Sequence, residues 1–240
     1  MTPTGIGLYL TRAAYADGVD RRAAKAKACR ARWVALCVGG DDGWRPRPEN
    51  VRTVRDAYQA HGLAVHVWKL DPAGAKPADQ AAWLIACSQG CAGVILDIEL
   101  AWKGRREDVR AYVSTMAAHC VGLGLALGVT SYPVASMHPT MPWTEMRSAC
   151  AWGGPQIYRS AERPTLARRA LSEWRAAYPA GVLPHLASYD VSGSPDTQAP
   201  QLRRHLALAD TAPGLAIWSD PSLDAQERAV LAAYSDKRGW

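Results

Sequence analysis

The residues with the clearest chemical potential are Asp97 and Glu99, two carboxylic acids at the end of the apolar run GVILDIEL (93–100). Side chains of a strand alternate between its two faces, so these acids share one face and lie about 6.6 Å apart along the strand. The residues that alternate with them are apolar and form the opposite face. Two close carboxylates do not both ionise easily, so one keeps a proton near neutral pH. A general acid requires that proton, and the spacing therefore predicts an acid–base site.

Glu99 is nearer the end of the run and has the longer side chain, so we predict that it is the proton donor. Asp97, one step deeper, is predicted to hold Glu99 in place and to steady a substrate acetamido group that acts as internal nucleophile. The structural alternative is a strand-end pair that caps backbone N–H groups or pairs with Lys103 or Arg105.

Eight short apolar runs, about 30 residues apart, must position this pair. They lie at 5–10, 33–40, 63–70, 93–100, 123–132, 153–158, 183–190 and 214–220. Helix-like segments at 48–62, 106–122, 163–181 and 222–234 separate several of them. Eight strand–helix units predict one α/β domain over residues 1–240, a single (β/α)8 TIM barrel. A doubly wound open sheet is the alternative, but GLYLTRAAY (7–15) carries no glycine fingerprint for it.

Barrels of this kind place their active sites at the C-terminal ends of the strands, which here are rich in carboxylates and aromatic residues. Aromatic faces stack on sugar rings, and carboxylates supply hydrogen bonds and acid–base groups, so we predict a groove for a sugar chain. Tyr158 is expected to hydrogen-bond a substrate carbonyl or Asp97, and the tryptophans to form the floor of sugar subsites. The predicted substrate-binding residues are Tyr158, Gln156, Trp68, Trp102, Trp218, Tyr132, Asp190 and Asp220. The alternative for the aromatic members is packing within the barrel.

A fourth strand that ends in Asp-x-Glu, with Tyr158 after the sixth, resembles the glycoside hydrolase family 25 muramidases. It also resembles a shortened form of the family 18 chitinase-type signature. In both families the Glu is the acid, so the resemblance implies that role for Glu99. Segment 130–158 is similar to phage-associated barrel proteins of glycosidase type in its Ser-Tyr, His-Pro, Pro-Trp and Pro-Gln-hydrophobic-Tyr motifs.

Two positions depart from these family patterns. Gly7 and Leu8 stand where family 25 enzymes carry an Asp, and Ile95 stands where the family 18 signature has a further Asp. Asp190 and Asp220 are the candidates to replace a missing carboxylate.

Composition and motifs exclude several other classes. No apolar run reaches the about 18 residues that cross a bilayer, and no basic residue precedes the first apolar stretch, so we expect neither a membrane span nor a secretory signal. The net charge is +6, but the basic residues are spread along helices such as 21–32, so no nucleic-acid partner is predicted. No metal site, cofactor, serine-hydrolase motif or nucleotide-binding loop is expected. The six cysteines (29, 37, 87, 91, 120 and 150) are predicted to be thiols.

Together these features predict a glycoside hydrolase of lysozyme type that cuts a β-1,4-linked N-acetylhexosamine polymer, with peptidoglycan preferred over chitin. We expect it to be made in the cytoplasm and to act at the cell wall after release, as an endolysin does, or as part of a phage particle. The alternative is a glycan-binding or structural barrel that has lost part of its catalytic set, which the missing acid at Gly7 favours. A third possibility, a barrel enzyme for a phosphorylated metabolite, has only the faint loop 192–195 in its support.

Overall fold

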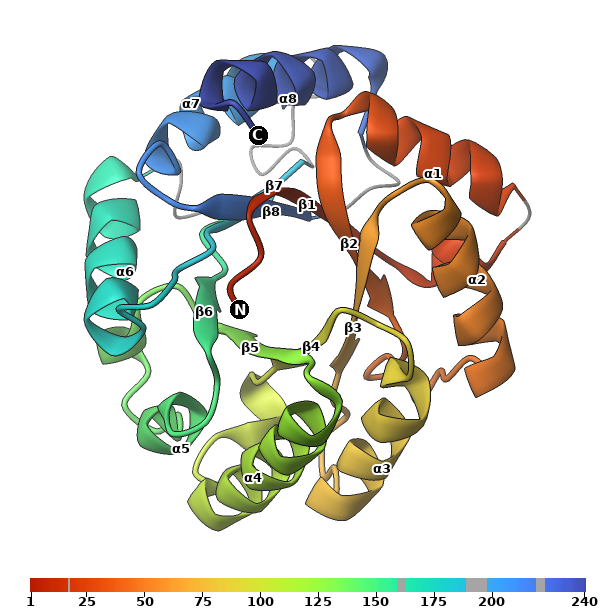
Figure 1. Cartoon of the computed structure of the whole chain (residues 1–240). Helices are drawn as coiled ribbons and strands as arrows, with labels where there is room; N and C mark the ends of the chain where they lie inside the picture. Colours follow the sequence, from red (N-terminus) through yellow and green to blue (C-terminus); the bar gives the residue numbers. More distant parts are fainter. Residues whose placement is uncertain (17, 159–162, 189–197, 219–222) are drawn as a thin grey trace.

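The computed structural model describes residues 1–16, 18–158, 163–188, 198–218 and 223–240. Eight parallel strands form a barrel with the helices outside it (Figure 1). The strands are β1 (Gly5–Leu10), β2 (Ala31–Cys37), β3 (Ala64–Leu70), β4 (Gly93–Asp97), β5 (Ala126–Ser131), β6 (Trp152–Pro155), β7 (His185–Ala187) and β8 (Gly214–Trp218). They are hydrogen-bonded in the order β6-β5-β4-β3-β2-β1-β8-β7. Two isolated bridges, Gly153 to Val182 and Gln156 to His185, join the β6 and β7 segments and nearly close the ring. The predicted (β/α)8 barrel is confirmed.

Eight α-helices of the described residues cover the outside of this barrel. They are α1 (Val19–Ala28), α2 (Pro48–Ala60), α3 (Pro77–Ser88), α4 (Arg106–Leu123), α5 (Trp143–Arg147), α6 (Pro164–Ala177), α7 (Gln198–Leu208) and α8 (Ala225–Arg238). Short 3₁₀ turns follow three strands, as η1 (Arg12–Tyr15), η2 (Leu100–Trp102) and η3 (Ala135–Met137). The η2 turn matters most for function, because it begins directly after Glu99.

Local sequence sets the helix ends. Helices α2, α3 and α6 each begin on a proline, whose fixed φ suits the first helical position and whose missing N–H is not needed there. Helix α4 ends at Gly124, which adopts a left-handed φ of 66°. Helix α8 begins with a capping box, in which Asp224 and Glu227 accept each other's backbone N–H groups. Asp224 is therefore the cap of this helix.

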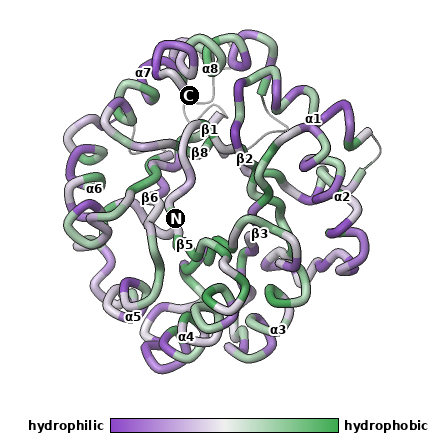
Figure 2. The backbone as a smooth tube through the Cα atoms, in the orientation of Figure 1, coloured by the Kyte–Doolittle hydropathy of each residue, from purple (hydrophilic) through white to green (hydrophobic). Residues whose placement is uncertain are grey.

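Two apolar layers hold the barrel together. Val94, Leu96 and Ile98 belong to the large core between the strands and the helices. Ile95 instead belongs to a smaller interior cluster that includes Trp33 and Trp152. The predicted alternation of faces along β4 is therefore confirmed. Figure 2 shows apolar residues concentrated along the strands and polar residues on the outward sides of the helices.

Indole rings fill the interior of the barrel where two glycines leave room for them. A Cβ atom on Gly7 would lie 2.1 Å from Trp33, and one on Gly128 would lie 2.1 Å from Trp152. Real Cβ atoms do not approach other atoms so closely, so any side chain at position 7 would displace the indole. The acid that family 25 enzymes carry in this region has no room at Gly7.

Other predictions about the chain concern thiols, metals and membranes. All six cysteines are buried thiols, and no disulfide joins any of them, as predicted. Across the described ranges, no group of three or more His, Cys, Asp or Glu side chains is arranged to hold a metal ion. No described helix is both long enough and apolar enough to cross a membrane.

Candidate active site

The two predicted acids lie where β4 ends at the mouth of the barrel. Asp97 is the last residue of the strand and is only 6% exposed, whereas Glu99 is half-buried. The strand stops at Asp97, three residues before the end of the run 93–100. The N–H of Ile98 still donates to Thr130 O at 3.0 Å, and the chain then turns into η2 at Glu99. Glu99 therefore extends from a turn rather than from the strand.

Gln156 reaches this pair from the segment after β6, two strands along the sheet from β4. Its side-chain nitrogen donates to Asp97 Oδ1 at 2.9 Å, while its backbone N–H donates to Ser131 O at 3.1 Å. The second bond fixes the start of the segment that follows β6, so the amide arrives at Asp97 in a defined position. Gln156 therefore supplies a hydrogen bond to Asp97, and the hydrogen bond expected from Tyr158 stays a prediction.

Burial controls the ionisation of the two acids. It raises the pKa of Asp97 well above its ordinary value, and the negative charges of Glu99 and Asp71 raise it further. The pKa of Glu99 is also raised by burial, but hydrogen bonds from Gln156 and Asp97 lower it in part. Both shifts favour a protonated carboxyl group, and the larger shift is at the deeper Asp97. The role of Glu99 as proton donor stays a prediction.

Aromatic side chains gather beside the acids. Trp218 lies 4.8 Å from Trp68, 5.4 Å from Tyr9 and 6.3 Å from Tyr158, measured between ring centroids. Trp68 is almost fully buried and donates from Nε1 to Leu10 O at 3.2 Å, whereas Trp218 and Tyr158 are partly exposed. Trp218 and Tyr158 are thus the predicted aromatics that keep exposed ring area for a sugar, and Trp68 supports them from below.

Tyr9 was missing from the predicted site although it lies in this cluster. Its hydroxyl group is buried and has no hydrogen-bond partner in the part of the chain that the structure describes. Burial raises its pKa well above the ordinary value, and the charge of Asp97 adds to this effect. The sequence feature that could have identified Tyr9 as a site residue is its position on the inward face of the first strand, two residues after Gly7.

Trp102 and Tyr132 lie differently from what the sequence suggested. Trp102 is 0% exposed, because its ring stacks on Tyr112 at 5.1 Å inside the protein. Trp102 lines a cavity beside Asp97 and Glu99 but has no solvent-exposed area, and its role as a subsite floor stays a prediction. Tyr132 is partly exposed, but its ring stacks on His138 at a centroid distance of 4.0 Å, which occupies one face. Asp190 and Asp220 lie outside the described residues.

A cavity of about 420 Å³ opens directly beside the acidic pair. Asp97 and Glu99 line one side of it, and Asp71, Asp41 and Leu100 line others. Leu100 is a large apolar side chain that stays mostly exposed at this edge. The volume lies within the range of small-molecule sites, which is about 300–1,000 Å³.

No protein-family model matches the sequence, and a search of curated proteins finds no significant match. Solved structures with a similar fold include a class V chitinase from Pseudomonas fluorescens Pf-5, at a TM-score of 0.68 and 14% identity over 97% of this chain and 99% of that chain. The family 18 chitinase ChiB from Flavobacterium johnsoniae has a TM-score of 0.66 and 10% identity over 99% and 95%. The spore cortex-lytic enzyme SleL from Bacillus megaterium QM B1551 has a TM-score of 0.64 and 12% identity over 97% and 74%.

These likenesses show that the chain has the barrel fold of chitinases. A barrel with different chemistry is also similar, the orotidine 5′-monophosphate decarboxylase from Methanocaldococcus jannaschii, at a TM-score of 0.55 and 11% identity. Function therefore has to be argued from the site itself. The resemblance to family 25 muramidases and to phage-associated proteins stays a prediction.

Proposed function

We propose that the chain is a glycoside hydrolase that cleaves β-1,4-linked N-acetylhexosamine polymers, with peptidoglycan as the preferred substrate. The observation that carries the proposal is the Asp97–Glu99 pair at the end of β4, bonded to Gln156 and placed beside a cavity of about 420 Å³. The fold supports it, since similar barrels include chitinases and a spore cortex-lytic enzyme. The net charge of +6 suits an anionic cell wall.

In this proposal, Glu99 is the general acid that protonates the leaving glycosidic oxygen. It is the more exposed of the two acids and borders the cavity. Asp97 holds the shared proton and passes it to Glu99. The carboxylate that this leaves on Asp97 then faces the positive charge that develops on the sugar. Gln156 fixes Asp97 during this exchange. An acetamido group of the substrate acts as internal nucleophile, a route that some glycosidases use in place of a second catalytic carboxylate.

The alternative is a barrel that binds a glycan without cleaving it. The filled space at Gly7 favours this alternative, because it removes one acid that the family 25 pattern requires. Action at the cell wall after release, or on a phage particle, is part of the main proposal and follows from the expected substrate alone.

The test compares wild type with Glu99→Gln on chitin oligosaccharides and on purified peptidoglycan. Reducing ends are counted for the first, and turbidity is followed for the second. Removing the acid is expected to lower kcat by about 10²–10⁴-fold while the fold stays intact. Glu107→Gln is the matched control, because Glu107 is exposed on α4 and pairs only with its neighbour Arg110 among the described ion pairs. Binding without cleavage by wild type would support the alternative, and equal turnover by Glu99→Gln would refute the acid assignment.

A further inference from the structure

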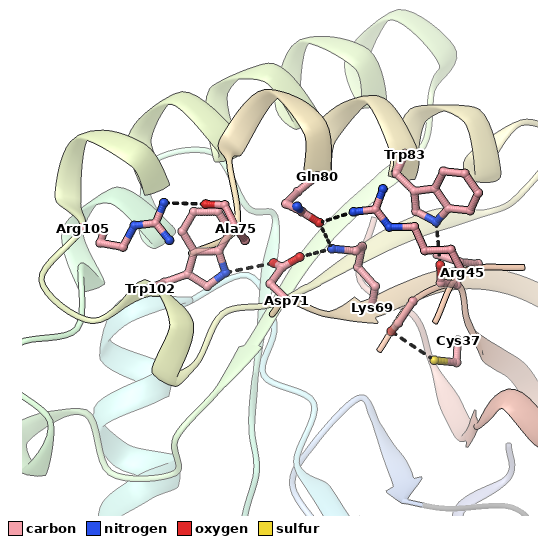
Figure 3. Close-up of polar contacts among 11 residues, drawn as sticks. Cys37, Arg45, Lys69, Asp71, Ala75, Gln80, Trp83, Trp102 and Arg105 are labelled. Carbon is pink, nitrogen blue, oxygen red and sulfur yellow. Dashed lines mark hydrogen bonds and ion pairs between the residues drawn. The ribbon is translucent and has the colours of Figure 1, made fainter. Parts of the chain in front are cut away.

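Two charged side chains are buried at the end of β3, the strand next to β4. Lys69 is 1% exposed and Asp71 is 4% exposed, at the end of β3. Lys69 Nζ donates to Asp71 Oδ1 and to Gln80 Oε1, and Arg45 donates to the same Gln80 oxygen at 3.2 Å (Figure 3). Burying an ion pair costs desolvation free energy that its attraction often fails to recover, so stability is a weak reason for its presence.

The ion pair is connected to the turn that carries Glu99. Asp71 Oδ2 accepts a hydrogen bond from Trp102 Nε1 at 2.9 Å. Trp102 is the last residue of η2, and its backbone N–H donates to Glu99 O at 3.0 Å. The indole is held from other sides by the stacked ring of Tyr112 and by Arg105, whose guanidinium lies 4.8 Å from the ring centroid. The side chain of Trp102 and the η2 turn therefore connect Asp71 to Glu99.

The register of the sheet brings Asp71 close to Asp97 as well. Leu70 is the direct partner of Asp97 across β3 and β4, and Asp71 follows it immediately. Asp71 also lines the same cavity as Asp97 and Glu99. The position two residues before Asp97, by contrast, holds Ile95, which packs inside the barrel. A third carboxylate beside the pair thus comes from the neighbouring strand.

We propose that Asp71 is a positioning residue for this site: it anchors the Glu99 turn through Trp102, and Lys69 holds its charge next to Asp97. The proposal rests on the function proposed above. Asp71 itself does not serve as an acid or a base, because Lys69 and Trp102 engage its two oxygens.

The negative charge of Asp71 acts on the pKa of Asp97 in one direction. It raises the pKa of Asp97, after burial and the charge of Glu99, so its removal lowers that pKa. Other titratable groups face the pair from several elements and stay in place when Asp71 is changed. They are Tyr9 on β1, Cys37 on β2, Lys69 on β3, Tyr112 on α4 and Tyr132 after β5.

The test uses the full chain and three variants. Asp71→Asn keeps the shape and an acceptor oxygen but removes the charge, and Trp102→Phe keeps the stacked ring but removes the N–H donor. Glu145→Gln is the matched control, since Glu145 is also a buried carboxylate with charged partners, Arg106 and Arg110, but lies on α5. Two readouts are taken: the pH titration of ¹³C-labelled Asp and Glu carboxyl groups, assigned with Asp97→Asn and Glu99→Gln, and kcat and KM on chitin oligosaccharides.

Asp71→Asn is expected to lower the titration midpoint of the pair by about one pH unit, because a like charge is removed. Trp102→Phe is expected to lower kcat by about 10-fold, with KM within about a factor of two, because the acid is misplaced. Glu145→Gln should lower the free energy of unfolding without changing the titration midpoint of the Asp97–Glu99 pair. The proposal is overturned if the Asp97–Glu99 pair has the same titration midpoint in Asp71→Asn as in Glu145→Gln. It is also overturned if kcat is unchanged in both Asp71→Asn and Trp102→Phe. The titration needs no turnover, so it decides on Asp71 even if wild type cleaves no glycan.

Discussion

Gln156 and Asp97 are joined by a hydrogen bond of 2.9 Å that links the segment after β6 to the end of β4. The amide donates to a carboxylate at the base of the candidate site, and its hydrogen bonding lowers the pKa of both Asp97 and Glu99. It therefore opposes the effect of burial, which raises both values. This contact therefore makes both acids easier to deprotonate than burial alone would leave them.

Replacing Gln156 with Leu should raise the pKa of the pair, because the donor that stabilises the charged form is lost. A hydrogen bond to a charged group contributes about 1.5–3 kcal/mol, so we expect kcat to fall by roughly 10-fold or more. The alkaline limb of the pH–rate profile, which reports the loss of the pair's proton, should move to higher pH. Gln59→Leu is the control, because Gln59 donates to Gly90 O on the surface at 2.8 Å. A wild-type profile in Gln156→Leu would show that this bond does not control the site.

Asp97→Asn should reduce activity and increase stability together. The folded pKa of Asp97 lies above its unfolded value, so the unfolded chain releases this proton at lower pH than the native protein does. The native state is therefore penalised increasingly as pH rises from the unfolded pKa toward the folded one, and Asn removes that penalty. At neutral pH we expect Tm to rise by about 2–4 °C for each kcal/mol recovered.

Activity should respond in the opposite sense in the same variant. Without Asp97 to share its proton, Glu99 loses it at lower pH, so the alkaline limb of the rate profile should shift downward. Calorimetry and kinetics on one preparation measure both effects. A lower Tm for Asp97→Asn at neutral pH would contradict the assignment of Asp97 as a destabilised, functional acid.

Much of the barrel could be read from the sequence, because each buried parallel strand is an apolar run of nearly constant spacing. The shortest strand shows the limit of this reading. The run at 183–190 predicted a longer strand than the observed His185–Ala187, because Pro184 has no N–H to donate to a neighbouring strand. Helix α5 is also short, and nothing in the spacing of the runs indicated its length.

The site was predictable only where local geometry decides it. Alternation along the run 93–100 was enough to predict that Asp97 and Glu99 lie together, apart from Ile98, although Glu99 itself extends from the η2 turn. The contact between Asp71 and Trp102 spans 31 residues, and no local pattern indicates it. Trp102 was predicted to form the floor of a sugar subsite, and the sequence did not indicate that its ring is buried after the η2 turn. Long-range contacts and turn directions of this kind depend on the packed fold.

The close packing of Gly7 against Trp33 predicts a sharp stability effect. Gly7→Ala would place a Cβ atom 2.1 Å from the indole, so the ring must shift, and overpacking of this kind costs about 1–3 kcal/mol or more. Gly122→Ala is the opposite control, because Gly122 lies inside α4 with open space around it and Ala is the better helix former by about 1 kcal/mol. Chemical denaturation should therefore show opposite signs for the two variants. Equal stability would mean that the interior of the barrel tolerates a side chain at position 7.

Two buried histidines make the fold sensitive to acid. Burial lowers the pKa of His66 to about 4 and that of His185 to about 3. Both values lie below the ordinary histidine value of about 6.5, so the unfolded chain binds protons between these limits while the native chain does not. Stability is therefore fully present above about pH 6.5 and falls as pH decreases toward the folded values. At pH 5 the loss amounts to about 2 kcal/mol for each histidine.

Thermal unfolding between pH 7 and pH 5 measures this loss. His185→Asn should flatten the pH dependence, because Asn keeps a side-chain donor near Thr130 Oγ1, which His185 Nδ1 approaches to 3.0 Å, but binds no proton in the unfolded chain. His66→Asn should act in the same way, and the double variant should lose nearly all of the slope because the two sites titrate independently. If the double variant still loses about 4 kcal/mol between pH 7 and pH 5, other groups carry the acid sensitivity and the histidine explanation is wrong.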